Sequence, residues 1–317
     1  MTVSRVVNDH PNVSEPTRRR VVAAIEQLRF RPSRTARALA LSSSRVIGVL
    51  DTTRGQLYGP ASTVAAIAEA ARGRDYSVVI AVMDPTDDAS VESATVHLLD
   101  QGAVAIVMVG PGARATQVAM AAAPGVPFAA MHSAVEGGQA HVPDQEQGGR
   151  TAARHLLDLG HRALAHLGGP PSWLEASSRR QGFVAELARI GLAPVTTQIG
   201  DWTAQSGYTA GRAMLADGGF SAIFCANDQM ALGLLHAARD AGLAVPDQLS
   251  VVGFDDIPEA AHYHPALTTV RQDFAQIGAR AVVTVLAQFD GVEPPPSGLR
   301  ELPLIVRAST APPGPRP

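Results

Sequence analysis

Between Val46 and Ser309 short apolar runs alternate with helical patterns, and this alternation constrains the fold more than any other feature. Apolar runs that are long enough for strands occur at 46–51, 77–82, 104–109 and 126–131, with helical spacing at 60–73, 88–101 and 114–122. Because the runs are almost continuously apolar, we expect parallel strands that are covered on both faces. The sequence therefore predicts an α/β fold with parallel sheets.

The alternation resumes after Asp144 as a second series. Expected helices occupy 148–159, 175–191, 205–216 and 229–241, and expected strands occupy 163–168, 195–199, 221–226, 249–254 and 268–272. A last strand is expected to end near Ser309, followed by an extended proline-rich tail. Two such series predict two similar lobes with a ligand between them.

Polar residues stand where three strands of the second series end. Asn227, Asp255 and Gln272 occupy these positions, and all three side chains can hydrogen-bond hydroxyl groups. Ligands of open parallel sheets bind outside the carboxyl ends of the strands. The alternative is that the three residues are only N-caps and turn residues. Their succession, together with Arg179 and Trp202 upstream, favours a small polar ligand.

The charge of the chain is unevenly distributed. Residues 1–40 carry eight arginines against three acids, a formal charge of +5, whereas the remainder carries 18 arginines against 26 acids, or −8. A basic N-terminal segment suggests contact with nucleic acid, although a solvated helix face would have the same composition. Cys225 is the single cysteine, which excludes an intrachain disulfide, and neither a membrane-length apolar run nor a signal pattern occurs. We therefore expect a cytoplasmic protein.

The N-terminal segment is expected to form a separate helical module. A helix should begin near Ser14, with Pro16 in its first turn and an apolar face of Val21, Ile25 and Leu28. A short helical pattern follows at 33–40. The serines at 42–44 form a linker, so we expect domains at 1–44 and 45–317.

Several motifs of the chain resemble one protein family. ANDQMALG at 226–233, SVVGFDD at 250–256 and LTTVRQDF at 267–274 stand in the order and spacing of the lactose-repressor (LacI/GalR) family of sugar-responsive transcription factors, as do TVSRVVN at 2–8 and ARALA at 36–40. The resemblance extends from Thr2 to about Pro312. It implies a two-lobed, periplasmic-binding-protein-like core preceded by an all-α helix-turn-helix module.

In such a core the chain crosses three times between the lobes, which the resemblance places near 143, 273 and 302. The first lobe is then about 45–143 and 274–302, and the second about 144–273 and 303–317. The chain lacks the leucine-heptad helix that makes the lactose-repressor type tetrameric, so we expect a homodimer.

The resemblance also implies an effector site between the lobes. Its expected residues are Arg179, Asn227, Asp255, Gln272, Trp202, Phe274 and His132. Arg179 would donate two hydrogen bonds to adjacent sugar hydroxyls, and Trp202 would stack on a sugar ring. His132 replaces an acidic residue of the lactose-repressor type, so the resemblance implies a sugar or glycoside and supports a galactoside only loosely.

The expected DNA contacts, likewise implied by the resemblance, are Thr2, Ser4, Arg5, Asn8, Arg34, Ala36 and Leu39. Arg5 would read base edges in the major groove, and Leu39 would insert into the minor groove. Without the resemblance, Leu39 would be interpreted as an ordinary packing leucine. The family pattern places the first helix of the helix-turn-helix before residue 2. Either the start is misassigned, which we favour, or part of the module has been lost. In both cases the chain as given is expected to hold a partial module that folds poorly alone and binds operator DNA weakly.

These observations predict a sequence-specific DNA-binding repressor that is relieved by a sugar. The alternative is a soluble sugar-binding protein without a DNA role. An enzyme is disfavoured, because the glycine-rich turn at 110–115 follows the third strand of its lobe and a P-loop and nucleophile elbow are missing. His155, His161 and His166 fall on a helix, a turn and a strand, which disfavours a metal site. Neither a metal nor a cofactor is expected.

Overall fold

The computed structural model divides the chain into two units, Met1–Arg45 and Val46–Pro317, which are described separately. It describes Val3, Val6 and residues 13–28, 44–53, 57–110, 112–131, 145–293 and 302–314. The expected helix at 33–40 lies outside these residues. None of the described helices is both long and apolar enough to cross a membrane.

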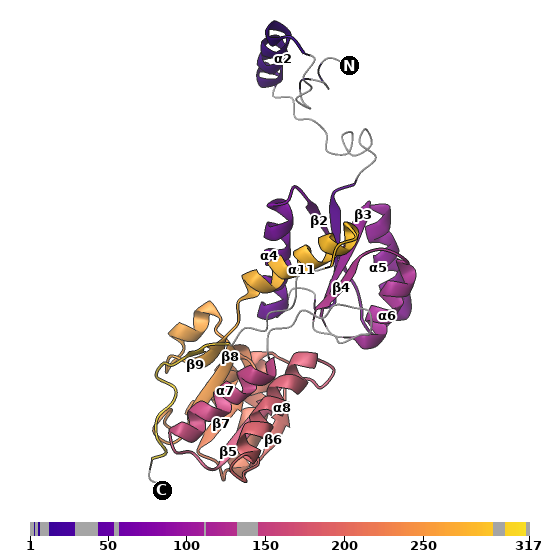
Figure 1. Cartoon of the computed structure of the whole chain (residues 1–317). Helices are drawn as coiled ribbons and strands as arrows, with labels where there is room; N and C mark the ends of the chain where they lie inside the picture. Colours follow the sequence, from indigo (N-terminus) through magenta and orange to yellow (C-terminus); the bar gives the residue numbers. More distant parts are fainter. Residues whose placement is uncertain are drawn as a thin grey trace. The chain divides into compact units, whose positions relative to one another are not determined.

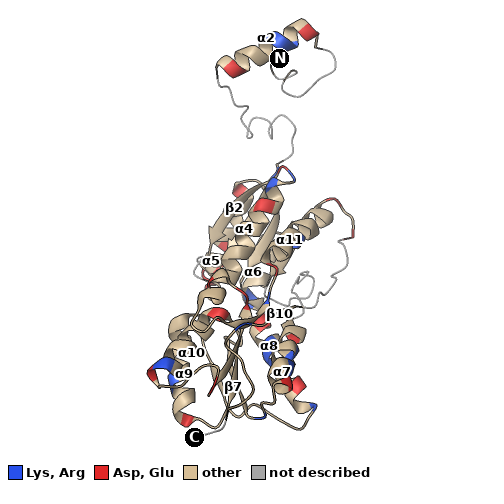
Figure 2. Cartoon of the chain, turned by 90° about the vertical axis from the view of Figure 1, so that its left-hand side faces the viewer, with Lys and Arg blue, Asp and Glu red and all other residues tan. Residues whose placement is uncertain are grey.

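The first unit contains helix α2, Glu15–Gln27, which begins after Ser14 as predicted. Ser14 has extended backbone, and Pro16 lies in the first turn, where its missing N–H costs nothing. Its three arginines are consecutive, at 18–20, and appear as one blue patch on the helix in Figure 2. The predicted apolar face is present, but no residue of α2 is fully buried.

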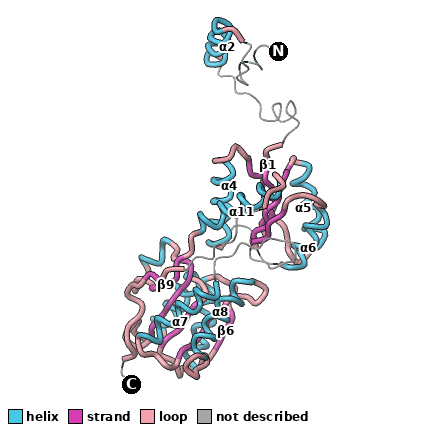
Figure 3. The backbone as a smooth tube through the Cα atoms, viewed as in Figure 1, coloured by secondary structure: helices cyan, strands magenta, loops and turns pink. Residues whose placement is uncertain are grey.

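The second unit begins with a four-stranded parallel sheet of order β2-β1-β3-β4 (Figures 1 and 3). Its strands are β1 Val46–Asp51, β2 Ser77–Val82, β3 Ala103–Val109 and β4 Phe128–Met131, and its helices are α4 Tyr58–Arg72, α5 Asp88–Asp100 and α6 Ala113–Ala122. One face packs through Ile47, Val49 and Ile67 against α4, and the other packs through Leu50, Leu98 and Ile106 against α5 and α6. Both faces are therefore covered, which explains the unbroken apolar strands.

The second sheet has six strands in the order β10-β9-β8-β7-β5-β6, and all neighbours except β10 pair in parallel. The strands are β5 Leu164–Gly168, β6 Thr197–Ile199, β7 Ala222–Cys225, β8 Ser250–Asp255, β9 Thr268–Arg271 and β10 Leu304–Ile305. The helices are α7 Gln145–Asp158, α8 Leu174–Ala188, α9 Ala204–Asp217 and α10 Asp228–Asp240, with a 3-10 turn η1 at Pro258–His262. Helices α7 and α8 pack on one face through Leu156, Phe183 and Phe224, and α9 and α10 pack on the other through Met214, Leu234 and Val251.

Helix α11, Phe274–Phe289, was not among the predicted elements. It follows β9 of the second sheet directly, yet it packs with α4 against the first sheet through Ile277, Ala281 and Val285 (Figure 1). The chain thus passes from one sheet to the other between Arg271 and Phe274. Two further passages fall between Met131 and Gln145 and between Phe289 and Leu304, in spans that include residues outside those described.

The predicted last strand, ending near Ser309, is wrong in its extent. Strand β10 covers only Leu304–Ile305, paired antiparallel with β9. Beyond it the chain leaves the ladder, because its hydrogen bonds go to separate elements: Ala308 N–H donates to Ala266 O and Ser309 Oγ donates to Val251 O. The segment therefore runs along the second sheet and is held by these hydrogen bonds, without forming a strand.

Candidate functional site

A small cavity lies at the carboxyl ends of the second sheet's strands, where α4 and α11 of the first sheet's half also reach. Six of the seven predicted effector residues line it: Arg179, Trp202, Asn227, Asp255, Gln272 and Phe274. His132 lies outside the described residues. Leu57, Tyr58, Gly59, Pro60, Trp173, Glu175 and Gln229 complete the lining. Residues from six separate stretches of sequence are thus brought to one place.

Arg179 is the centre of the polar side of the cavity. It lies on α8 and is 4% exposed. Its Nε donates to Gln145 Oε1 at 2.7 Å, one terminal nitrogen donates to Ala226 O, and the other lies 3.4 Å from Asp255 Oδ1. The guanidinium carbon also lies 3.8 Å from the centre of the Phe254 ring. Burial lowers the pKa of Arg179, and the nearby Asp255 carboxylate opposes that shift.

Asp255, Gln272 and Gln145 continue this network as a chain of hydrogen bonds. Gln272 Nε2 donates to Asp255 Oδ1 at 2.7 Å, and Gln145 Nε2 donates to Gln272 Oε1 at 2.7 Å. The next residue, Asp256, does not join this network, because it forms ion pairs with Arg271 and Arg307. Gln145 was not predicted, since nothing in the stretch around it marks it as a binding residue.

Asn227 caps the N-terminus of α10, which was the alternative to a ligand-binding role in the sequence analysis. Its Oδ1 accepts from Met230 N–H at 2.9 Å at the start of α10, and its Nδ2 donates to Trp202 O at 3.0 Å. Asn227 therefore also positions Trp202, which stands at a φ of 76°. Asp255 stands at a φ of 108°. Left-handed backbone at non-glycine residues is costly and concentrates at functional sites, which supports a binding role here.

The aromatic side of the cavity consists of two ring pairs. Trp173 and Trp202 meet edge to face with ring centres 5.6 Å apart, and Tyr58 and Phe274 meet likewise at 5.7 Å. The Trp202 indole lies directly on the backbone of Gly169, where a Cβ would come within 2.2 Å of the ring. Only glycine permits this approach. Such rings offer apolar faces on which a sugar ring can stack.

Two acids beside Arg179 were not predicted. Glu175 lies one helical turn before Arg179 on α8 and is 4% exposed, so the spacing of four residues was a signal that could have found it. Asp228 lies behind the cavity, accepting from Thr269 Oγ1 at 2.6 Å and from Ile257 N–H at 2.9 Å. Burial, followed by the charge of Asp255, raises the pKa of Asp228 well above its usual value.

The room inside the cavity is about 40 Å³. Small-molecule sites usually enclose about 300–1,000 Å³. The network of Arg179, Gln145 and Asp255 fills the polar side, and Tyr58 N–H reaches Gln229 Oε1 at 3.4 Å across from the first sheet's half. A ligand would therefore have to displace some of these contacts as it enters.

The three histidines that were weighed as metal ligands have separate partners. His155 Nε2 bonds Thr310 Oγ1, and His161 bonds Ser221 Oγ and Ala311 O. His166 Nδ1 donates to Phe224 O at 3.0 Å, and its ring stacks on that phenyl group. No group of three or more metal-binding side chains occurs among the described residues.

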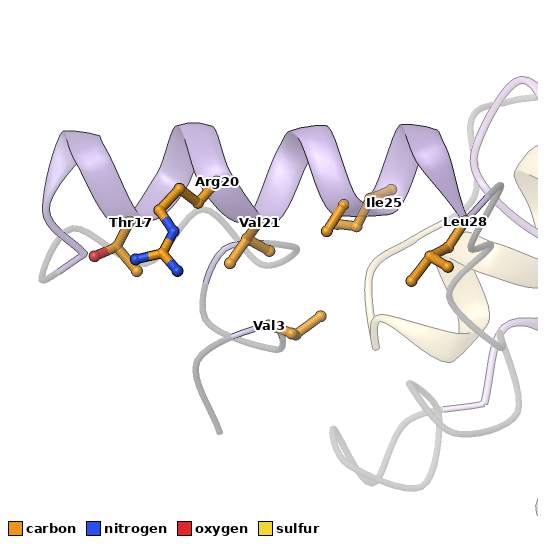
Figure 4. Close-up of a pocket in the computed structure, with 7 residues that line it drawn as sticks. Val3, Thr17, Arg20, Val21, Ile25 and Leu28 are labelled. Atoms are coloured by element: carbon orange, nitrogen blue, oxygen red, sulfur yellow. The ribbon is translucent and has the colours of Figure 1, made fainter.

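In the first unit, all seven predicted DNA contacts lie outside the described residues. What can be described is α2, whose apolar face lines a hollow of about 530 Å³ together with Val3 (Figure 4). Val21, Ile25 and Leu28 point into it, and Arg20 and Thr17 lie toward one end. Leu28 is 76% exposed. The face is therefore not covered by described parts of the unit.

Comparison with known proteins places both units in one family. Residues 1–33 match the bacterial regulatory proteins of the lacI family, and residues 153–310 match a periplasmic binding protein-like domain. The lactose operon repressor of Escherichia coli is 35% identical over 315 residues, covering 98% of this chain and 87% of the relative.

Solved structures agree with this result. A lac repressor dimer bound to operator and the anti-inducer ONPF superposes with a TM-score of 0.86 at 33% identity, covering 98% of this chain and 94% of that one. The complex of the transcriptional regulator CelR with cellobiose superposes at 0.76 with 26% identity, covering 96% and 94%. The predicted α/β fold with its N-terminal module is thereby confirmed, and the chain belongs to the LacI family of bacterial transcriptional regulators, which are not enzymes.

Proposed function

We propose that this chain is a cytoplasmic repressor whose affinity for operator DNA is lowered by a sugar or glycoside bound in the cavity around Arg179. The observation that carries the proposal is the convergence of six predicted effector residues on one cavity. Guanidinium, carboxylate and amide groups meet aromatic faces there. This combination suits a ligand with hydroxyl groups on a ring.

DNA binding is assigned to the first unit. Its net positive charge favours contact with phosphates, and the related lac repressor structure contains operator DNA. By the family resemblance, Arg5 contacts base edges, and Thr2, Ser4, Asn8, Arg34, Ala36 and Leu39 contact the backbone or bases. We further propose that the chain acts as a homodimer, as that related structure is titled.

Ligand control requires two states that bind the ligand differently. The cavity of about 40 Å³ provides such a difference, because a ligand must separate contacts that join the two sheets' halves. The state that opens for the ligand then differs from the state that binds DNA tightly. A ligand of equal affinity for both states would have no effect.

The proposal is tested with full-length chain in two steps. First, thermal melting is recorded with galactosides, other glycosides and free sugars, where a ligand at about 100 times its Kd adds roughly 2.7 kcal/mol of stability. Second, DNA sites are selected from a random library, and their affinity is measured with and without the stabilising sugar. We expect that sugar to weaken binding to the selected site.

Arg5→Ala serves as the matched variant for the DNA step. We expect this variant to lose its preference for the selected DNA site while keeping the sugar-induced rise in melting temperature. Sugar binding without any selected DNA site would instead favour a sugar-binding protein without a DNA role. Failure of every sugar to stabilise the chain would exclude the proposed ligand class.

A further inference from the structure

One hydrogen-bond donor in the wall of the cavity has no acceptor in the protein. Trp202 lines the cavity and is 5% exposed. Its indole Nε1–H is buried, and no protein group in the described part of the chain accepts a hydrogen bond from it. Tryptophan can only donate through this atom. A buried donor without an acceptor destabilises a folded chain and is rare in native structures, so it calls for an explanation.

The indole is held in place by its neighbours. The carbonyl of Trp202 accepts from Asn227 Nδ2 at 3.0 Å, and the six-membered ring of the indole lies against Gly169. Trp173 meets the indole edge to face with ring centres 5.6 Å apart, and the guanidinium carbon of Arg179 lies 5.6 Å from the ring centre. The Nε1–H is therefore fixed in direction and cannot turn toward another acceptor.

The acceptors beside its contact residue Asn227 are already in use. Asn227 Oδ1 accepts from Met230 N–H at 2.9 Å, and the carbonyl of Ala226 accepts from Arg179. The backbone of Trp202 also stands at a φ of 76°, in the left-handed region that is costly for a residue other than glycine. The fold thus holds this indole in position at a cost in stability, which is typical of residues that serve binding.

We infer that the effector supplies the acceptor, an oxygen atom that receives a hydrogen bond from Trp202 Nε1 when the ligand occupies the cavity. The inference rests on the proposed function and deepens it, since it makes Trp202 a specificity-determining donor as well as an apolar surface for a sugar. Hydroxyl, ring and glycosidic oxygens of a sugar can all accept. Because the N–H lies in the plane of the indole, the oxygen lies beyond the edge of the ring and not over its face.

This hydrogen bond gives the cavity a preference that apolar contact does not provide. A ligand without an oxygen at that position leaves the N–H buried and unpaired, whereas a ligand with one pairs it. Removal of the N–H should therefore have opposite effects on the free chain and on its complex. The ligand-free chain should become more stable, and ligand binding should become weaker. A tryptophan that only packs would not show this opposition.

The test removes the N–H and keeps the shape of the side chain. Benzothienylalanine, in which sulfur replaces the N–H of tryptophan, is incorporated at Trp202 of the full-length chain through an amber codon. Calorimetric titration of the parent chain and this variant uses methyl galactosides, glucosides and mannosides. For the sugar that binds most tightly, an analogue series replaces each hydroxyl by hydrogen and the ring and glycosidic oxygens by sulfur, one at a time.

We expect one oxygen whose removal weakens binding to the parent chain about tenfold or more. The variant should bind the unmodified sugar about tenfold less tightly, and removal of that same oxygen should then weaken binding only about twofold or less. Removal of the other oxygens should have the same effect in both chains. The melting temperature of the ligand-free variant should rise by about 2 °C or more, because the unpaired donor is gone.

The same replacement at Trp173 is the matched control, since it removes the other indole N–H of the chain. Whatever its effect on overall affinity, this control should keep the parent's full dependence on the paired oxygen. Trp202→Phe also removes the N–H, and it decides the test if the benzothienylalanine variant does not fold. It should show the same loss of dependence on that oxygen.

Full dependence on every oxygen in the variant at Trp202 would overturn the inference and leave the proposed sugar response intact. A lower melting temperature of that ligand-free variant would overturn it as well, because the N–H would then have a partner in the free chain. Equal loss of dependence in the Trp173 control would show that the effect is not specific to Trp202 and would also overturn the inference. Absence of binding by every sugar would overturn the inference and the proposed sugar response together.

Discussion

The two sides of the cavity differ in chemistry. The second sheet's side presents Arg179, Asp255 and Gln272, joined by hydrogen bonds and by an ion pair. The first sheet's side presents Leu57, Tyr58, Gly59 and Pro60, with Phe274 from α11 beside them. The second sheet's side is therefore rich in polar side chains, whereas the first sheet's side is mainly apolar and aromatic.

This difference suggests that one side of the cavity determines ligand specificity and the other contributes mainly to affinity. Directional hydrogen bonds discriminate among ligands, because an unmatched buried polar group is costly. Apolar contact contributes affinity but discriminates weakly, since it depends mainly on area. We therefore expect changes on the second sheet's side to alter which ligand binds, and changes on the first sheet's side to alter how firmly the cavity closes.

The largest effect is expected for Arg179→Ala. The substitution removes the hydrogen-bond donors of the polar wall and leaves Asp255 buried beside Gln272 without its guanidinium, which costs about 2–5 kcal/mol of binding free energy. Effector affinity should fall by at least about thirtyfold in calorimetric titration while DNA binding without effector persists. Arg180→Ala, at the exposed neighbouring position, is the control.

A normal effector response in Arg179→Ala would break the comparison, because recognition would then not depend on the polar wall. An equal loss in Arg180→Ala would point to a general change of α8 instead of a specific contact.

Acid should destabilise the second sheet's half in particular. Burial lowers the pKa of His166 to about 4, below the value of about 6.5 for an exposed histidine. The native state thus favours the neutral ring, so its contribution to stability is complete above pH 6.5 and is lost as the pH falls toward 4. Over that window the free energy of unfolding should drop by about 3 kcal/mol.

The two tryptophans of the chain, Trp173 and Trp202, both lie in this half, so their fluorescence in urea titrations reports its unfolding. His166→Leu should flatten the acid dependence, whereas His236→Gln, at an exposed position on α10, should retain it. An identical pH dependence in parent and His166→Leu would show that other groups cause the loss.

Gly169→Ala should disturb the aromatic wall from behind. The added methyl group would come within 2.2 Å of the Trp202 indole, so the ring must shift. We expect a loss of about 1–3 kcal/mol in the free energy of unfolding and a fall of about tenfold in effector affinity. Gly73→Ala is the control, since its nearest neighbour would be 3.6 Å away.

Unchanged affinity in Gly169→Ala, measured by titration with a folded variant, would show that the position of Trp202 does not matter for the ligand. The polar wall would then carry recognition alone.

The smallest effect is expected for Tyr58→Ala on the first sheet's side. The substitution removes the edge-to-face contact with Phe274, worth about 0.5–1.5 kcal/mol. Effector affinity should change by less than about tenfold, without a change in the order of preference among sugars. A reordered preference in titrations would show that the first sheet's side also discriminates.

Much of the fold could be predicted because its signals are local. The predicted strands 46–51 and 77–82 coincide with β1 and β2, since alternation of apolar and polar segments depends only on neighbouring residues. The missed helix α11 carried the same signal in Ile277, Ala281 and Val285, but Phe274 was considered only as a cavity residue. The length of β10 was misjudged because pairing, not propensity, decides where a strand ends.

Cavity residues at strand ends could be predicted because their signal is also local, whereas cavity residues elsewhere could not. Asp255 and Gln272 follow buried strands, and carboxyl ends of parallel strands meet at one edge of the sheet. Gln145 stands at the start of a helix in a polar stretch with no motif. Its role emerges only when α7 and α8 pack together.

The sequence by itself determined the family, the alternating fold and six residues of the cavity, because motif order, periodicity and strand-end position can be read along the chain. The tertiary structure decided which groups bind Arg179 and how much space remains in the cavity. Arg179 and Gln145 are 34 residues apart, and Gln145 and Gln272 are 127 apart. Contacts over such separations follow from the packing of whole helices and sheets.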